Sequence, residues 1–402
     1  MRLTGHTGPA PIRTLAAAAL VTMAAAACGA PAASPQQGPA ASQKATRTAA
    51  PVRHTAGTAP FLSRFRTVTQ VASTVPADGD VNPYGIAVVP ASTGRLIRGD
   101  TLVSNFNDKA NVQGTGRTIM EISPAGAVRQ FARVTTLPAG QSCPGGIGLT
   151  TALAVLRGGW VVVGSLPVTR TGALPAVDPT GCLIVLDSHG KPVAAWTSPD
   201  INGPWDLTAK ATTAGAMLFV SNVLSRPTSR SDLTPPATGL CTVVRLDIAL
   251  PSGGLPKLTR QTVIGSGFPW QQNKAALIQG PTGLAVSASG TLYVAETVSS
   301  SITAIPAATS RATAVRFGTH ALTTGGKLNG PLGLTLAPGG DLIAVNGGNG
   351  DAVEITPAGR QTASVTLVKN GAGDLFGVTG APGGTGLLLV NDGTNALDLF
   401  HG

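Results

Sequence analysis

Oxygen-bearing side chains recur at one position of a pattern that repeats along this sequence. In five of the six copies, an apolar run of the Leu-x-Val type ends in an amide or a carboxylate. These residues are Asn105, Asn222, Glu296, Asn346 and Asn391. As a ring of oxygens they would suit Ca²⁺ (calcium) or another hard cation. However, a metal needs one ligand set only, whereas Asn and Asp commonly bond their own backbone in turns, so recurrence in nearly every copy favours a turn role.

A second motif, Pro-x-Gly or a variant of it, precedes the first apolar run of each copy. Its middle position is occupied by Tyr84, Gly145, Trp205, Thr282, Leu332 and Phe376. Aromatic residues make up only 4% of the chain, so three of them at one position are notable. They indicate an aromatic pocket for an apolar or flat ligand, with Tyr84, Trp205, Phe376 and the neighbouring Asp206 as candidate contacts. The preferred alternative is that the rings only pack against one another.

Histidines are too few and too scattered to form a catalytic set. The chain contains His6, His54, His189, His320 and His401. Of these, only His320 lies in a loop that could reach the predicted binding face described below. Nucleophilic catalysis or general acid–base catalysis by histidine needs a second group to position the ring. We therefore predict no catalytic residues and no cofactor, and we favour a binding protein over an enzyme.

The two motifs belong to units that each contain four short strands. The units begin near residues 82, 143, 203, 280, 330 and 374, about 54 residues apart on average. Apolar runs of four to eight residues, separated by Gly- and Pro-rich turns and without helical periodicity, are typical of β-strands. A four-stranded sheet buries both faces when it stands beside copies of itself around an axis. The sequence thus predicts an all-β, six-bladed β-propeller with four-stranded antiparallel blades over residues 61–402.

The two ends of this region complement each other. The sixth unit stops at Gly402 after its third strand, and an unassigned strand-like segment, Phe65–Ser73, precedes the first unit. We expect this N-terminal strand to fill the outer position of the sixth blade and to close the ring with ladder hydrogen bonds.

The unit Gly280–Ile305, GPTGLAVSASGTLYVAETVSSSITAI, resembles the NHL-repeat family of β-propellers. The resemblance covers about residues 65–402 and implies the fold, which carries lyases, lactonases and binding modules alike. Gluconolactonase-type propellers place Asn and Asp beside the motif Gly as metal ligands, and this chain departs from that pattern. Virginiamycin B lyase and the peptide-amidating lyases depend on histidines that this chain lacks. A metal-dependent, lactonase-like hydrolase or lyase at the channel mouth is therefore the alternative function.

In a propeller, the start of the first strand and the turn between the second and third strands lie at the same end of the ring. Four long insertions fall at that end, at residues 106–116, 166–181, 223–240 and 265–279. Insertions gathered on one face of a rigid scaffold mark a binding face. We expect a small molecule or a protein to bind there.

The N-terminal region predicts export. Residues 1–27 combine two arginines with the apolar run Leu15–Ala27, which suits a signal peptide and is too short to span a bilayer. Cys28 follows three alanines and resembles the lipidated cysteine of bacterial lipoproteins. Residues 29–60 are rich in Ala, Pro and Ser and read as a disordered tether. We expect a lipoprotein on the outer face of the cell membrane, with secretion as the alternative.

The positive charge belongs mainly to this leader. The chain has a formal net charge of +10, and seven basic residues but no acid precede Asp78. A basic leader suits an anionic membrane surface, and the folded region lacks the basic stripe of a nucleic-acid-binding protein. We predict a monomer that binds no nucleic acid.

Three cysteines remain outside the leader: Cys143, Cys182 and Cys241. In an exported protein two of them are expected to form a disulfide. The preferred pair is Cys182–Cys241, because each follows a long insertion. The alternative is Cys143–Cys182.

Overall fold

The computed structural model of the chain describes residues 59–166, 181–224, 237–273 and 277–402. The predicted signal peptide, Cys28 and all but the last two residues of the predicted tether lie outside this part. Most of the insertions at 166–181 and 223–240 also lie outside it. Among the described residues, no helix has both the length and the apolar character needed to cross a membrane.

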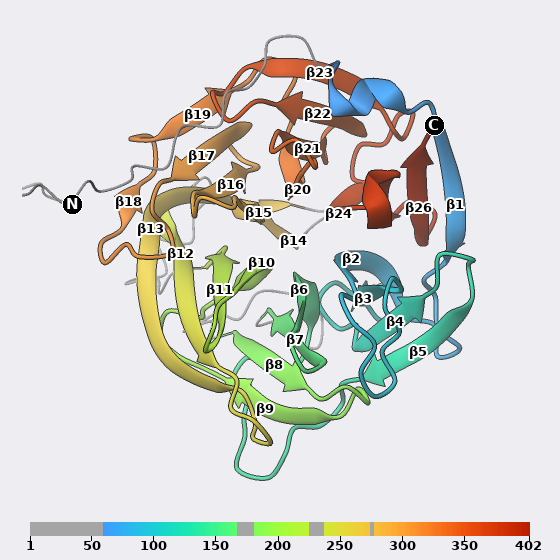
Figure 1. Cartoon of the computed structure of the whole chain (residues 1–402), viewed down its shortest axis with the longest axis vertical. Coiled ribbons are helices and arrows are strands. Elements are labelled where there is room, and N and C mark those ends of the chain that lie inside the picture. Colours follow the sequence, from blue (N-terminus) through green and yellow to red (C-terminus); the bar gives the residue numbers. More distant parts are fainter. Residues whose placement is uncertain (1–58, 167–180, 225–236, 274–276) are drawn as a thin grey trace, which may run out of the picture. The chain divides into compact units, whose positions relative to one another are not determined.

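The described strands form six antiparallel blades arranged in a ring (Figure 1). Blade one contains β2 (Val81–Val88), β3 (Thr101–Asn107), β4 (Thr118–Ile122) and β5 (Val128–Arg133). Blade two contains β6 (Leu149–Leu156), β7 (Trp160–Ser165), β8 (Cys182–Leu186) and β9 (Pro192–Trp196). Blade three contains β10 (Pro204–Ala211), β11 (Gly215–Asn222), β12 (Ala237–Ala249) and β13 (Lys257–Asn273), extended by β14 (Leu277–Gln279) and β18 (Val315–Arg316).

The other three blades have the same order, from the centre to the rim. Blade four contains β15 (Pro281–Val286), β16 (Leu292–Glu296), β17 (Ser301–Ile305) and β19 (Ala321–Thr324). Blade five contains β20 (Pro331–Leu336), β21 (Leu342–Asn346), β22 (Asp351–Ile355) and β23 (Gln361–Thr366). Blade six contains β24 (Leu375–Gly380), β25 (Gly386–Asn391), β26 (Ala396–His401) and β1 (Thr67–Ser73). The predicted six-bladed propeller is confirmed.

The N-terminal strand closes the ring, as predicted. β1 pairs antiparallel with β26, with Thr67 opposite His401 and Ser73 opposite Ala396. Before it, the short helix η1 (Phe61–Arg64) packs into the apolar core of blades five and six. Both carboxylate oxygens of Glu354 on β22 accept hydrogen bonds from η1, one from Phe61 N and one from Leu62 N, each at 2.8 Å. The chain is therefore fixed to the ring before its first strand begins.

The glycine of the opening motif allows the innermost strands of neighbouring blades to approach each other. A Cβ atom at Gly283 would lie 2.5 Å from the carbonyl oxygen of Leu332, and one at Gly377 would lie 2.5 Å from that of Tyr84. Real Cβ atoms do not tolerate such distances, so a larger residue would push the two blades apart. The motif thus contains glycine because neighbouring inner strands of the ring lie too close for a side chain at this position.

Blade two uses a different segment for this motif than the sequence predicted. Leu149 pairs with Ser165 as Pro281 pairs with Glu296 in blade four. The Ser104 hydroxyl donates to the carbonyl of Thr150 at 2.7 Å, just as a serine of blade three bonds the motif residue of blade four. The middle position is therefore Thr150, and the assignment of Gly145 was wrong. The CPGG segment imitates the motif but forms a turn with Gly146 at φ 86.

The insertion at 265–279 is also more regular than expected. Most of it continues β13 or forms β14, which pairs back onto β13. Phe268 and Trp270 of this segment are buried, so their alternation along a strand explains why it does not form an open loop.

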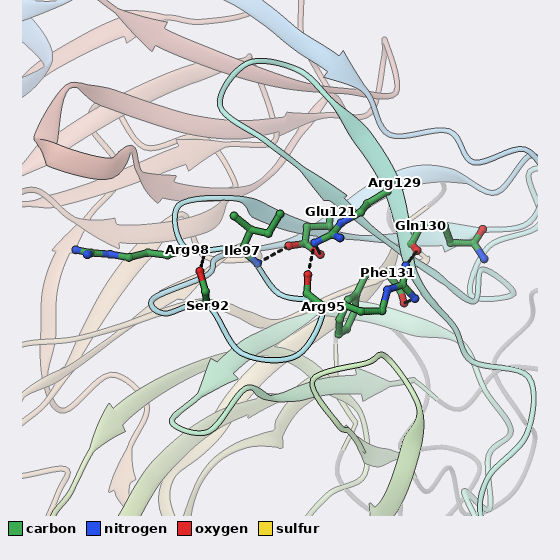
Figure 2. A network of polar contacts seen from close by, with 8 residues as sticks. All are labelled: Ser92, Arg95, Ile97, Arg98, Glu121, Arg129, Gln130 and Phe131. Atoms are coloured by element: carbon green, nitrogen blue, oxygen red, sulfur yellow. Dashed lines mark hydrogen bonds and ion pairs between the residues drawn. The ribbon is translucent and has the colours of Figure 1, made fainter.

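A loop of blade one connects two blades at the rim (Figure 2). The buried carboxylate of Glu121 accepts from Ile97 N at 2.9 Å and pairs with Arg129 at 2.8 Å. The Arg95 guanidinium donates to the carbonyl oxygen of Gln130 at 3.0 Å, and Arg95 N donates to a carbonyl of blade two. These bonds hold the loop between β2 and β3 against both β5 and the next blade.

Candidate functional site

Four aromatic rings meet where the innermost strands begin. Tyr84 stacks on Phe376 with 4.0 Å between ring centroids and on Phe106 with 4.4 Å. Trp205 lies 5.8 Å from Tyr84, and all four side chains are at most 1% exposed. Burial and the nearby charge of Asp392 raise the pKa of Tyr84 well above its usual value. The rings form a plug at this end of the channel, and a ligand contact by Tyr84 or Trp205 stays a prediction.

A cavity of about 450 Å³, which we call the face cavity, lies beside this plug on the predicted binding face. Its lining comes from the β13–β14 segment, from the turns between the second and third strands of blades four and five, and from the segments that open blades five and six: Gln271, Gln279, Thr297, Val298, Ser300, Asn329, Gly330, Leu332, Gly347, Gly348, Ala372, Gly373 and Phe376. Leu332 and Phe376 belong to this lining although they are only 3% and 1% exposed, and Phe376 is the one predicted contact residue that reaches this cavity.

Among the residues that the structure describes, the polar groups lining the face cavity are all uncharged. The Gln271 amide donates to Gln279 Oε1 at 2.9 Å, which fixes the two side chains side by side. Ser300 accepts a bond from Gly330 N at 2.9 Å. The amides and the Asn329 side chain offer donors and acceptors together. Such a surface matches a neutral ligand that carries hydroxyl or amide groups.

Glycines keep the face cavity open. A Cβ at Gly347 would lie 2.3 Å from a methyl carbon of Leu332, and one at Gly348 would lie 2.3 Å from Asn329 Oδ1. Backbone bonds link these loops, including Gly373 N to Gly347 O at 2.7 Å. Part of the cavity wall is therefore glycine backbone, which is polar without being charged.

A second cavity, of about 400 Å³, occupies the channel beyond the plug, and we call it the channel cavity. All six innermost strands line it, mostly with aliphatic side chains and with Thr151, Thr208, Thr335 and Thr379. Among the described residues that line it, Asp206 is the one ionisable side chain. Its carboxylate accepts from Leu284 N at 2.9 Å, and burial raises the pKa of Asp206 to about 7. Of the four predicted contact residues, Asp206 therefore lies in a different cavity from Phe376.

Each of the five predicted metal ligands makes a hydrogen bond to another residue of the ring. Asn105 Nδ2 donates to Thr74 O, Asn222 Oδ1 accepts from Gly203 N, Glu296 accepts from Val298 N and Ser299 N, Asn346 Nδ2 donates to Lys327 O, and Asn391 Nδ2 donates to Asp398. Across the ranges that the structure describes, no three His, Cys, Asp or Glu side chains come together as a metal-binding group. Calcium binding by these residues stays a prediction.

Glu296 is the most deeply placed of these residues. Its side chain is fully buried, and burial raises its pKa to about 7 despite hydrogen bonds from Val298 N and Ser299 N. It is the last residue of β16 and precedes Thr297, which lines the face cavity. The carboxyl thus supports the loop under the cavity wall without reaching its surface.

The preferred disulfide was wrong and its alternative is correct. Cys143 bonds Cys182, with 5.4 Å between their Cα atoms. Cys241 is a free, buried thiol that donates to Val223 O at 3.1 Å. Cys182 and Cys241 lie on the third strands of neighbouring blades, and packed sheets stand about 10 Å apart. That spacing exceeds the Cα separation that a disulfide bridges.

Several residues of the two cavities were missed in the sequence. Gln271 and Gln279 lie in an insertion that the sequence did mark as part of the binding face, but nothing singled out these two amides. Thr151 was missed because the motif in blade two was placed five residues too early, at Pro144–Gly146 in place of Leu149–Thr151. Correct pairing of the second strand would have revealed it.

No protein-family model and no curated protein matches the chain. Solved structures with a similar arrangement include a gluconolactonase from Xanthomonas campestris, at 15% identity and a TM-score of 0.49 over 88% of this chain and 98% of that one. Regucalcin from Agrobacterium tumefaciens, described as a calcium-binding protein, has 15% identity and a TM-score of 0.49 over 82% of this chain and 94% of that one. Virginiamycin B lyase from Staphylococcus aureus has 15% identity and a TM-score of 0.44 over 83% and 88%. Likenesses of this size identify no function for the chain.

Proposed function

We propose that this protein is a cell-envelope binding protein whose face cavity takes a small, uncharged ligand rich in hydroxyl or amide groups. The observation that carries the proposal is a cavity of about 450 Å³ lined by uncharged hydrogen-bonding groups beside two large apolar side chains. Ligand pockets in proteins combine a mostly apolar lining with a few convergent polar groups in this way.

The absence of charge among the lining residues decides the ligand class. A charged ligand would lose hydration on entering and would find no side chain of opposite charge among the described lining residues. A neutral sugar or a peptide unit would instead exchange its water bonds for those of Gln271, Gln279 and the glycine backbone. The more exposed apolar lining residues Val298 and Ala372 would cover its apolar side.

The cell-envelope location rests on the leader and is supported by the cysteines. A signal peptide, a cysteine placed for lipidation and a tether without large apolar residues form a consistent export signal. A disulfide between Cys143 and Cys182 suits an oxidising compartment outside the cytoplasm.

Binding is tested by melting the purified full chain with neutral monosaccharides, neutral disaccharides and capped dipeptides at 10 mM. We expect at least one of these probes to raise the melting temperature by several degrees, because a ligand that binds only the folded state stabilises it. Gln279→Ala is expected to reduce the shift by more than half. Gln70→Ala, on the exposed side of β1, serves as the matched control and should leave the shift unchanged.

A shift that survives Gln279→Ala, or a shift produced only by charged probes, contradicts the proposed site. Gly348→Val provides a second check, since its side chain would fill the cavity next to Asn329. This variant should abolish binding while the protein still melts cooperatively. No shift with any neutral probe would also contradict the proposal.

A further inference from the structure

The end of the ring opposite the face cavity is basic. At this end lie the turns between the first and second strands and between the third and fourth strands of the blades, and we call it the back face. Exposed basic side chains recur in its turns: Arg95, Arg98, Arg157, Lys191 and Arg360. The acidic residues of the same turns, as far as the structure describes them, are buried or half-buried: Asp100, Asp187 and Asp341. The exposed charge of the back face is therefore mainly positive.

Exposed apolar side chains share the back face with these basic groups. In the described ranges, Ile97, Val128 and Leu255 lie in or next to back-face turns and are 49%, 43% and 46% exposed. Ile97 stands between Arg95 and Arg98, whose side chain points away from the bonded network of this loop (Figure 2). These apolar side chains would gain free energy from contact with an apolar phase.

An apolar pocket of about 140 Å³ widens the apolar surface of the back face. It lies between blades one and six, and three back-face turns contribute to its lining, with Gly99, Pro124 and Pro382 among the lining residues. Gly99 belongs to the same β2–β3 loop as Ile97. The apolar character of this face is therefore not limited to isolated side chains.

The chain enters the ring at the back face. β1 begins at Thr67, opposite His401 at the end of β26. Directly upstream, Arg66 N donates to His401 O at 3.0 Å, and η1 precedes it. The side chains of Arg64 and Arg66 are exposed at this point. The sequence that links Cys28 to η1 therefore joins the ring on the side that carries the basic turns.

We propose that the back face lies on the anionic surface of a lipid bilayer, with its arginine and lysine side chains on the lipid phosphates. A guanidinium donates two parallel hydrogen bonds to a phosphate, and basic side chains are attracted to anionic lipid. Ile97, Val128 and Leu255 enter the headgroup layer, where apolar side chains leave water. The inference rests on the proposed function in one respect, because the cell-envelope location supplies the membrane. The face cavity then opens away from the bilayer.

Charge alone does not select this partner. A soluble polyanion would also match the basic side chains, but it offers no apolar phase to Ile97, Val128 and Leu255. A bilayer that contains anionic lipid matches both kinds of group. A lipid anchor at Cys28 would also hold the back face within reach of such a bilayer.

Oxidation of side chains by hydroxyl radicals tests which face a bilayer covers. The full chain is mixed with vesicles of equal parts phosphatidylglycerol and phosphatidylcholine, or with vesicles of phosphatidylcholine alone. With the anionic vesicles we expect the oxidation rates of Ile97 and Leu255 to fall by roughly three-fold or more, because lipid covers them. The neutral vesicles should leave both rates nearly unchanged. Val75, an exposed apolar side chain at the opposite end of the ring, is the internal control and should keep its rate.

Charge reversal separates the back face from the basic leader, which is the same in every variant. Arg98→Glu combined with Lys191→Glu changes two exposed side chains in back-face turns. We expect this variant to lose at least half of the protection at Ile97 with anionic vesicles. Lys327→Glu combined with Lys369→Glu is the matched control, since it makes the same charge change on two exposed side chains at the opposite end. It should keep the full protection.

Three results would overturn the proposal: no protection of Ile97 and Leu255 by anionic vesicles, equal protection of Val75, or the same loss of protection in both charge-reversed variants. Equal protection by soluble inorganic polyphosphate would assign the face to a polyanion instead and would also overturn it. If a charge-reversed variant fails to fold, the comparison of Ile97 with Val75 in the wild type still decides. Ligand binding in the face cavity is measured without lipid, so failure of either proposal is recognised separately.

Discussion

Three carboxyl groups of the ring titrate far from their usual range. Burial raises the pKa of Asp206, Glu296 and Asp392 to about 7, and the charge of Asp374 contributes at Asp392. In the unfolded chain these groups ionise near pH 4, so the folded ring holds protons that the unfolded chain has released. These three buried carboxyl groups therefore link the stability of the ring to pH.

Glu296 gives the clearest pH prediction. Below its usual pKa of 4.5 both states are protonated and the full stability is present, whereas between pH 4.5 and about 7 only the unfolded chain ionises. The free energy of unfolding should therefore fall as pH rises through this window and level off above it. From pH 5 to pH 8 the loss should be smaller in Glu296→Gln than in the wild type by roughly 2–3 kcal/mol. Urea denaturation at four pH values measures this. An identical pH dependence in Glu296→Gln and in the wild type would contradict the prediction that burial raises the pKa of Glu296.

At the residue scale, the sequence predicted which kinds of residue occupy the strand ends better than it predicted which residues those side chains bond. The oxygen-bearing residues at the strand ends were found because they recur, but the free Cys241 could not be separated from Cys143, since pairing depends on the distance between blades. Gln271 and Gln279 bring a polar pair into the face cavity only because β14 folds back onto β13. That contact leaves no periodic signal in the sequence.

At the scale of strands, the opening-motif glycine can be tested directly. Gly377→Ala places a methyl group 2.5 Å from the carbonyl oxygen of Tyr84 on the neighbouring blade. We expect a loss of about 2–4 kcal/mol in the free energy of unfolding, because two backbones must separate. Gly380→Ala is a matched control on the same strand, since a Cβ there meets nothing within 4 Å. Chemical denaturation of both variants should separate them, and equal losses would show that the close approach does not matter.

The attachment of η1 to blade five makes a second prediction at this scale. Glu354→Ala removes the acceptor of two backbone bonds, from Phe61 N and Leu62 N. Buried bonds to a charged group contribute more than neutral ones, so we expect a loss of about 2–4 kcal/mol and faster hydrogen exchange at residues 61–66. Asp351→Ala, on the same strand and bonded to Thr366, is the control and should cost less than about 1 kcal/mol. Unchanged exchange at the helix in Glu354→Ala would contradict this anchor.

Fold prediction from the sequence succeeded because the strands obey short-range rules. The period of apolar runs and turns predicted six blades, and the missing fourth strand of the last unit predicted where Phe65–Ser73 belongs. Blade two shows the limit. Its CPGG segment matches the motif by type, but the hydrogen bond from Ser104 to Thr150 and the pairing of Leu149 with Ser165 decide the register. Register is a tertiary property that the local sequence did not specify.

For the molecule as a whole, the proposed envelope location depends on Cys28. In a bacterial host that exports the chain, Cys28→Ser should release most of the protein from the membrane fraction into the soluble fraction, because a lipid chain supplies the anchor. Wild-type protein should incorporate labelled fatty acid, and the variant should not. The folded part should melt at the same temperature in both forms. Wild-type protein found in the soluble fraction without lipid would support the secreted alternative.

The account depends most on the closure of the ring, because the plug and both cavities exist only if blade six is completed by β1. The most direct measurement is native-state hydrogen exchange of the full chain, read at the backbone amides of residues 67–73. β1 is the edge strand of blade six, so only alternate amides of residues 67–73 bond to β26. These bonded amides should open only with the same large free energy as those of Ala396–His401, close to that of global unfolding. Exchange of the β1 amides at the rate of an unstructured peptide, while β26 stays protected, would contradict the closed ring.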